Sequence, residues 1–133
     1  MTWMRPENLQ QALKWLDEYH PRIVCGGTDI FVDWPRRRHE FAGVHWLDIR
    51  SLPELKRTAF TSEGLEIGAA VTAAEIWQRP EFQAVSALQQ AARVVGGWQI
   101  QNRASLGANI VNASPAADMV IPLVAYGAEV KLE

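Results

Sequence analysis

Residues Ile23–Ile30 read Ile-Val-Cys-Gly-Gly-Thr-Asp-Ile, a short apolar run that stops at two glycines. The apolar run favours a strand, and Thr28-Asp29 can cap a short helix that Pro35 is expected to end. Glycines let a backbone approach a ligand closely, and free N–H groups at a helix start can hold an anion such as pyrophosphate. Taken alone, a double glycine after a strand is more often a plain tight turn than an anion cradle. This one also lacks the third glycine of the dinucleotide fingerprint and the spacing of a P-loop.

The sequence on either side of this stretch extends the pattern. Pro6–Tyr19 reads as a helix, with Asn8 as its N-cap and an apolar face that includes Leu9, Ala12 and Leu16. Val44–Ile49 reads as a second strand, and Pro53 is placed to begin another helical turn. The order helix, strand, helix, strand favours a small, partly parallel sheet.

The second part of the chain has a different pattern. Gly64 lies in the turn of an expected hairpin, and Thr72 with Glu75 forms a capping-box pattern. Ser114-Pro115 is a favourable helix start. The expected elements are the hairpin strands 58–61 and 65–68, helices over 81–95 and from 114 to 125, and a strand over 128–132. The change of pattern predicts two lobes, residues 1–57 and 58–133.

Composition excludes several classes of protein. The 133 residues carry 13 Lys+Arg against 15 Asp+Glu, a net charge of −2. The chain therefore lacks the excess of positive charge that is typical of nucleic-acid-binding proteins. No apolar run approaches the roughly 18 residues of a membrane span, and no secretory signal is evident. Cys25 is the one cysteine, so the sequence excludes an internal disulfide, a cysteine-rich zinc site and an iron–sulfur cluster held by this chain alone, and it fits a reducing, cytoplasmic compartment.

A second unusual stretch runs from Gln99 to Asp118. From Gln101 to Asp118, small and amide side chains fill it almost throughout, and the bulky residues are Arg103, Leu106, Ile110 and Val111. Small side chains permit close backbone contact, and Asn and Ser supply hydrogen-bond donors and acceptors. The stretch is therefore either a segment that wraps a ligand or a loop followed by a capped helix.

Together these stretches resemble the FAD-binding flavoprotein subunit or domain of the molybdenum hydroxylases, the xanthine dehydrogenase and carbon monoxide dehydrogenase family. The first marker is Gly26-Gly27-Thr28-Asp29-Ile30, and the second covers Gln99–Ile110 and Ala113–Asp118. Gln101 stands where the family commonly has arginine, and Ala108 replaces a second glycine. An alanine there costs about 1 kcal/mol or more if the backbone needs a positive φ, and otherwise can crowd the flavin.

The resemblance implies a cofactor, FAD, and the residues that contact it. A first loop would hold the pyrophosphate, a second turn would contact FAD, and Asp118 would make a polar contact. No catalytic residue and no metal ligand is implied. The implied cofactor-binding residues are Ile23, Val24, Cys25, Gly26, Gly27, Thr28, Asp29, Ile30, Ser105, Leu106, Gly107, Ala108, Asn109 and Asp118.

The resemblance also implies the fold and the role. The fold would be α+β, of the PCMH and carbon monoxide dehydrogenase flavoprotein type, with a small βα lobe and a mixed lobe incomplete at its C-terminus. The chain would be an oxidoreductase component, inactive as a fragment, in a hetero-oligomer. It would pass electrons from an iron–sulfur (2Fe–2S) subunit and a molybdopterin-binding large subunit through FAD to NAD⁺ or another acceptor. The alternatives are an interaction module that has lost FAD and a flavin reductase of the cell-wall precursor type.

Overall fold

The computed structural model describes residues 2–132, and it is an α+β protein of two compact units. The first unit extends to Val71 and the second begins at Thr72. The change of sequence pattern at 57/58 comes earlier than this division. The residues after 57 stay in the first unit because Gly68 N donates to Arg57 O and Ala70 N donates to Leu55 O, both at 2.8 Å.

Unit 1 is built on a three-stranded parallel sheet. Its strands are β1 (Thr2–Met4), β2 (Arg22–Val24) and β3 (His45–Asp48), in the order β1-β3-β2. Both pairings are parallel, with Trp3 opposite Trp46 and Val24 opposite Asp48. The expected parallel sheet is confirmed, and β1 is an additional strand that the sequence did not predict.

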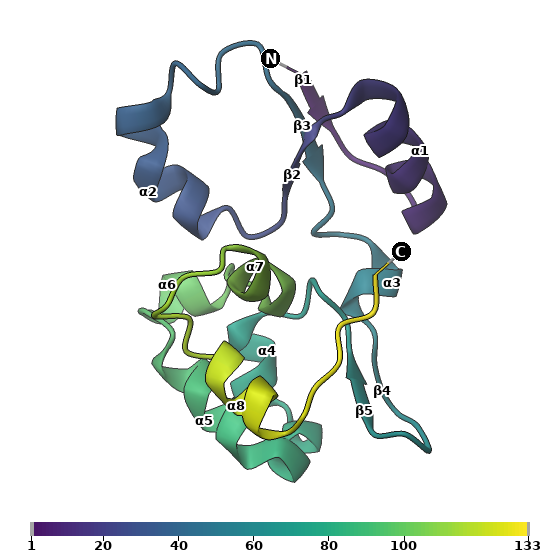
Figure 1. The fold of residues 1–133 in the computed structure, drawn as a ribbon, viewed down its shortest axis with the longest axis vertical. Helices are drawn as coiled ribbons and strands as arrows, with labels where there is room; N and C mark the ends of the chain where they lie inside the picture. Colours follow the sequence, from purple (N-terminus) through teal and green to yellow (C-terminus); the bar gives the residue numbers. More distant parts are fainter. Residues whose placement is uncertain (1, 133) are drawn as a thin grey trace. The chain divides into compact units, whose positions relative to one another are not determined.

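The two longer helices of unit 1 cover opposite faces of this sheet (Figure 1). Helix α1 (Leu9–Tyr19) begins at the expected cap, where Gln11 N donates to Asn8 Oδ1 at 2.8 Å. It buries Ala12 against Leu47 and Leu52. On the other face, Val24, Phe41 and Trp46 form a buried cluster, against which Ile30 and Trp34 of α2 (Thr28–Arg37) pack.

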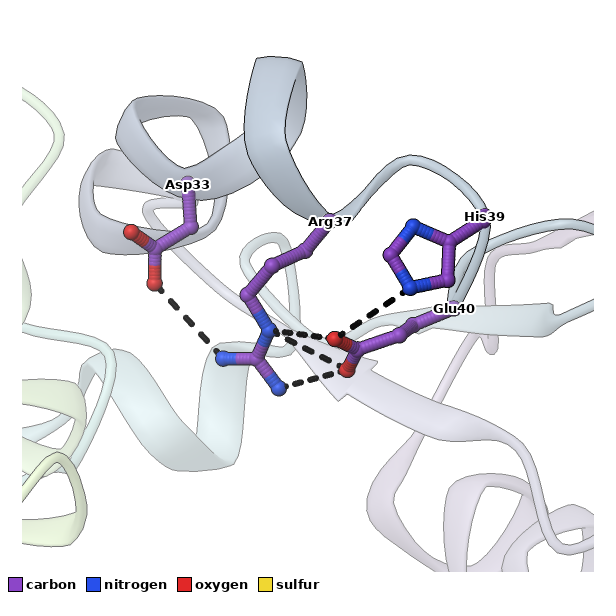
Figure 2. Close-up of polar contacts among 4 residues, drawn as sticks. All are labelled: Asp33, Arg37, His39 and Glu40. Atoms are coloured by element: carbon purple, nitrogen blue, oxygen red, sulfur yellow. Dashed lines mark hydrogen bonds and ion pairs between the residues drawn. The ribbon is translucent and has the colours of Figure 1, made fainter.

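Two predictions for α2 were wrong. Gly27 is its N-cap, so Thr28 and Asp29 are already helical, and the helix continues past Pro35 to Arg37. Proline removes one intrahelical hydrogen bond, but only near the helix end. Side-chain pairs hold that end. Arg37 lies 3.6 Å from Asp33 Oδ2 and donates from Nη2 to Glu40 Oε2 at 2.7 Å (Figure 2).

The remainder of unit 1 follows the prediction. Helix α3 (Pro53–Lys56) begins at Pro53, and β4 (Thr58–Phe60) pairs antiparallel with β5 (Leu65–Ile67). Gly64 has φ +141° in the hairpin turn, a value that L side chains rarely adopt.

Unit 2 is helical. Helix α4 (Ala73–Gln78) has the predicted capping box between Thr72 and Glu75. The single helix expected over 81–95 is wrong in part, because a 3₁₀ segment, η1 (Pro80–Val85), precedes α5 (Ser86–Val94). Val85, with φ −123° and ψ 57°, interrupts the helical backbone. Three short helices follow: α6 (Trp98–Gln101), α7 (Leu106–Val111) and α8 (Val120–Ala125).

The predictions for the last stretch of unit 2 were also wrong. Ser114-Pro115 starts a turn in place of a helix, with Ala116 N donating to Ser114 Oγ at 3.2 Å and Ala117 N to Ser114 O at 3.1 Å. Ala113 precedes it with φ 50°, and α8 begins only at Val120. Residues 128–132, the last that the structure describes, form no strand. None of the described helices is long and apolar enough to cross a membrane.

Candidate functional site

The first predicted site segment is the turn between β2 and α2. Val24 ends the strand and Thr28 begins the helix, so Cys25–Gly27 makes the whole connection. Gly26 and Gly27 are buried, Thr28 and Ile30 are half-buried, and Asp29 and Ile23 are exposed. Eight consecutive predicted residues therefore form one strand end, turn and helix start, as the residue pattern predicts.

Gly27 has a backbone conformation that requires glycine. Its φ is +74°, and a Cβ built there would lie 2.8 Å from Phe31 Cε2 and 3.1 Å from Phe31 Cδ2. The Phe31 ring therefore packs directly against the turn. Phe31 is itself 56% exposed, so it forms one outer side of this segment.

The helix start supplies backbone donors. Phe31 N donates to Gly27 O at 3.0 Å, which is the first hydrogen bond of α2. The amides of Thr28, Asp29 and Ile30 precede it, and amides of a first helical turn have no acceptor within their own helix. These donors, together with the positive end of the helix dipole, favour an anion at the turn.

The second predicted segment spans the start of α7. Ser105 is its N-cap residue and bridges to Thr72, while Ala73 N donates to Ala104 O at 2.9 Å. The start of α4 thus fixes the start of α7. The local sequence indicates no regular structure here, because glycine, asparagine and serine are weak helix formers.

Two polar atoms of this segment are buried without a hydrogen-bond partner. They are Ser105 Oγ and Asn109 Oδ1. Ser105 is 1% exposed, and its Oγ does not cap α7. Ser105 and Asn109 are four residues apart, and their backbones are joined by the bond from Asn109 N to Ser105 O at 3.0 Å. A buried polar atom left unsatisfied costs about 1–3 kcal/mol, which a ligand that hydrogen-bonds to this pair would recover.

Ala108 is compatible with the backbone it occupies. It lies inside α7, and His20 and Ala113 are the non-glycine residues with positive φ within the part of the chain that the structure describes. The strain expected for a positive φ at Ala108 therefore does not arise. Gly107 and Ala108 are both half-buried, and Leu106 is buried.

Asp118 lies apart from any helix. The expectation that it occupies the first turn of a helix was wrong, because it is exposed in the turn before α8. Its carboxylate therefore does not lie in the first turn of a helix, where it would interact with the helix dipole. Its contact with a cofactor stays a prediction.

Gln101 has a role that the sequence analysis missed. It is 7% exposed, and its side chain bonds to Trp77 Nε1 at 3.0 Å, Arg93 O at 2.8 Å and Gly96 O at 3.3 Å. Nothing in the sequence distinguishes this buried glutamine from the exposed Gln99 beside it. Across residues 2–132 no three His, Cys, Asp or Glu side chains gather as metal ligands.

Comparison with known proteins connects these features. A family described as the FAD binding domain in molybdopterin dehydrogenase matches residues 1–133. The nicotinate dehydrogenase FAD-subunit of Eubacterium barkeri is 33% identical over 96% of this chain and 44% of its own. The xanthine dehydrogenase FAD-binding subunit of Escherichia coli O157:H7 is 30% identical over 98% and 45%. The chain thus spans less than half the length of these relatives.

The fold has solved counterparts. Quinoline 2-oxidoreductase from Pseudomonas putida 86 superposes with a TM-score of 0.80 at 24% identity, over 90% of this chain and 42% of the other. At that identity the likeness concerns the fold alone.

Proposed function

The chain belongs to the family of FAD-binding domains of molybdopterin dehydrogenases, whose cofactor is FAD, and we propose that it is the FAD-holding part of an electron-transferring oxidoreductase. The observation that carries the proposal is the pair of unpartnered buried atoms, Ser105 Oγ and Asn109 Oδ1. A hydroxyl and a side-chain carbonyl can meet the donors and acceptors of a dinucleotide.

The residues that would hold FAD fall into two groups. Backbone amides at the start of α2, with the small residues Gly26 and Gly27, would receive the pyrophosphate. Ser105, Leu106, Gly107, Ala108 and Asn109 would contact FAD through the start of α7, and Asp118 would add a polar contact. The fit is chemical: small residues where a backbone must come close, and unpaired polar atoms where a ligand must be hydrogen-bonded.

Bound FAD would supply the redox chemistry, because it accepts and releases electrons. The residues above bind and orient it. We infer that the electrons come from iron–sulfur and molybdopterin-binding subunits of a hetero-oligomer and leave to NAD⁺ or another acceptor. Two of the relatives are named as subunits, which supports a multi-subunit assembly. A cytoplasmic location goes with this proposal, because a single cysteine suits a reducing compartment.

The test is a titration of FAD into the purified chain, followed by tryptophan fluorescence and by the flavin absorption band. Saturable binding with a Kd of about micromolar or tighter is expected. The variant Ser105→Ala should weaken binding, and Thr58→Val, which removes a buried hydroxyl outside both segments, is its matched control. Absence of saturable binding would favour the alternative of an interaction module that has lost FAD. The same titration of a chain extended to the length of its relatives would then decide: binding would show that residues outside these 133 complete the site, and no binding would show that the site is lost.

A further inference from the structure

Three parallel strands bring the residues that follow them to one edge of the sheet in unit 1. Arg5 follows β1, the Cys25–Gly27 turn follows β2, and Ile49 with Arg50 follows β3. Ile49 N donates to Val24 O at 3.0 Å, so the chain leaving β3 is bonded to the end of β2. Because β3 lies between the other two strands, Arg50 follows the strand next to the glycine turn.

Asp48 lies on the face of the sheet that α2 covers. Trp46, two residues earlier in β3, packs in the cluster that includes Trp34 of α2. Alternate residues of a strand share a face, so Asp48 is on this side too. The Cys25–Gly27 turn leads into α2 on the same side. Asp48 therefore shares both an edge and a face of the sheet with the glycine turn.

Asp48 holds two arginines at this edge. Its side chain is 5% exposed, and its Oδ2 lies 3.5 Å from Arg5 Nε and 3.6 Å from Arg50 Nη2. Its Oδ1 also accepts from Arg50 N at 3.1 Å, so Arg50 is held through both backbone and side chain. Two guanidinium groups against one carboxylate leave one net positive charge.

Both guanidinium contacts are longer than the usual N–H···O hydrogen bond of about 2.9 Å, so N–H groups remain for a further acceptor. The Arg50 side chain is 36% exposed and can reach one. A diphosphate at the glycine turn would also meet the exposed carboxylate of Asp29. A cation held nearby offsets that repulsion.

We propose that Arg50, oriented by the buried Asp48, is an additional binding residue for the diphosphate of a dinucleotide at the Cys25–Gly27 turn. The inference rests on the proposed function, because the diphosphate is that of FAD. Arg5 follows β1, on the other side of β3, and its guanidinium adds a second positive charge beside Asp48. A guanidinium suits this role because its planar donors match phosphate oxygens.

The test compares three probes, FAD, riboflavin and inorganic pyrophosphate, on the wild-type chain and on Arg50→Gln. FAD and pyrophosphate affinity should fall about tenfold in the variant, while riboflavin, which has no phosphate, binds as before. Arg50→Lys should recover part of the loss. Arg36→Gln, an exposed arginine at the end of α2, is the matched control and should change none of the three. Equal affinity of Arg50→Gln and wild type for FAD and pyrophosphate would overturn the inference.

A second measurement needs no variant. In the wild-type chain, the Nε–H resonance of Arg50 should shift on addition of pyrophosphate, while that of Arg36 stays in place. An unmoved Arg50 resonance would contradict the inference whether or not FAD binds. If the wild type failed to bind FAD but Arg50 still responded to pyrophosphate, the anion site would stand and the failure would concern the proposed function alone.

Discussion

Trp77 Nε1 donates a 3.0 Å hydrogen bond to Oε1 of Gln101, linking α4 to the end of α6. The same amide donates from Nε2 to Arg93 O, at 2.8 Å, and to Gly96 O, at 3.3 Å. One buried side chain therefore joins α4, the end of α5 and α6, four residues before Ser105. The acceptor at position 101 matters because an indole N–H can only donate.

Gln101→Leu should destabilise the chain by about 1–3 kcal/mol, because it leaves the Trp77 indole and two carbonyls without partners. Gln101→Arg should also destabilise it, since a guanidinium has no acceptor for Trp77. Urea unfolding measures both. Gln99→Leu, at an exposed position two residues away, should stay within about 0.5 kcal/mol of wild type. Equal effects at positions 99 and 101 would refute the role given to Gln101.

Gly27→Ala tests the first segment, with Gly43→Ala as its control. Both glycines have similar positive φ, +74° and +77°, but only at Gly27 would a Cβ meet another group, the Phe31 ring. Gly43→Ala should cost about 1 kcal/mol and leave FAD affinity unchanged. Gly27→Ala should cost more and also weaken FAD binding. The double variant Gly27→Ala/Phe31→Ala should lose the extra destabilisation, because the Phe31 ring no longer meets the new Cβ. It should still bind FAD more weakly than wild type.

Ser105→Ala should separate stability from binding. Its hydroxyl is buried without a partner, so removing it should leave the free energy of unfolding unchanged or higher. FAD affinity should nevertheless fall about tenfold, through the lost hydrogen bond. Thr58→Val removes another unpartnered buried hydroxyl outside both segments and should leave FAD affinity as it is. A loss of stability in Ser105→Ala would show that the hydroxyl has a structural role.

Glu54 makes stability depend on pH. Its pKa lies below the ordinary value of 4.5, because its carboxylate accepts the Leu9 N–H, at 3.0 Å, and its own backbone N–H. A carboxyl whose pKa is lowered by folding stabilises the folded state above its unfolded pKa. That stability is lost as pH falls through the lower folded value. The midpoint temperature of thermal unfolding, measured from neutral pH to below pH 4.5, should therefore fall less steeply for Glu54→Gln than for wild type.

Three local signals in the sequence were confirmed, although the local signal for a helix start at Ser114-Pro115 was wrong. The Asn8 cap, the capping box of Thr72 and Glu75 and the hairpin glycine Gly64 depend on neighbouring residues, and the structure has all three. The resemblance also led to the family and to FAD.

Non-local contacts account for what was missed. Strand β1 has three residues and exists because it pairs with β3, more than forty positions away. Helix α2 passes Pro35 with its end held by Arg37, Asp33 and Glu40. Gln101 is buried because Trp77 and two carbonyls meet there, which no local pattern indicates. The strongest marker of the candidate site, an unsatisfied Ser105 Oγ, is likewise a property of packing.

We propose that FAD contacts each of two segments, the strand–turn–helix of Ile23–Ile30 and the start of α7 at Ser105–Asn109. Hydrogen–deuterium exchange with and without saturating FAD tests it most directly. The account predicts slower exchange at the amides of both segments, with the β4–β5 hairpin amides unchanged as the internal reference. Saturable FAD binding that protects neither segment, or only amides elsewhere in the chain, would contradict it.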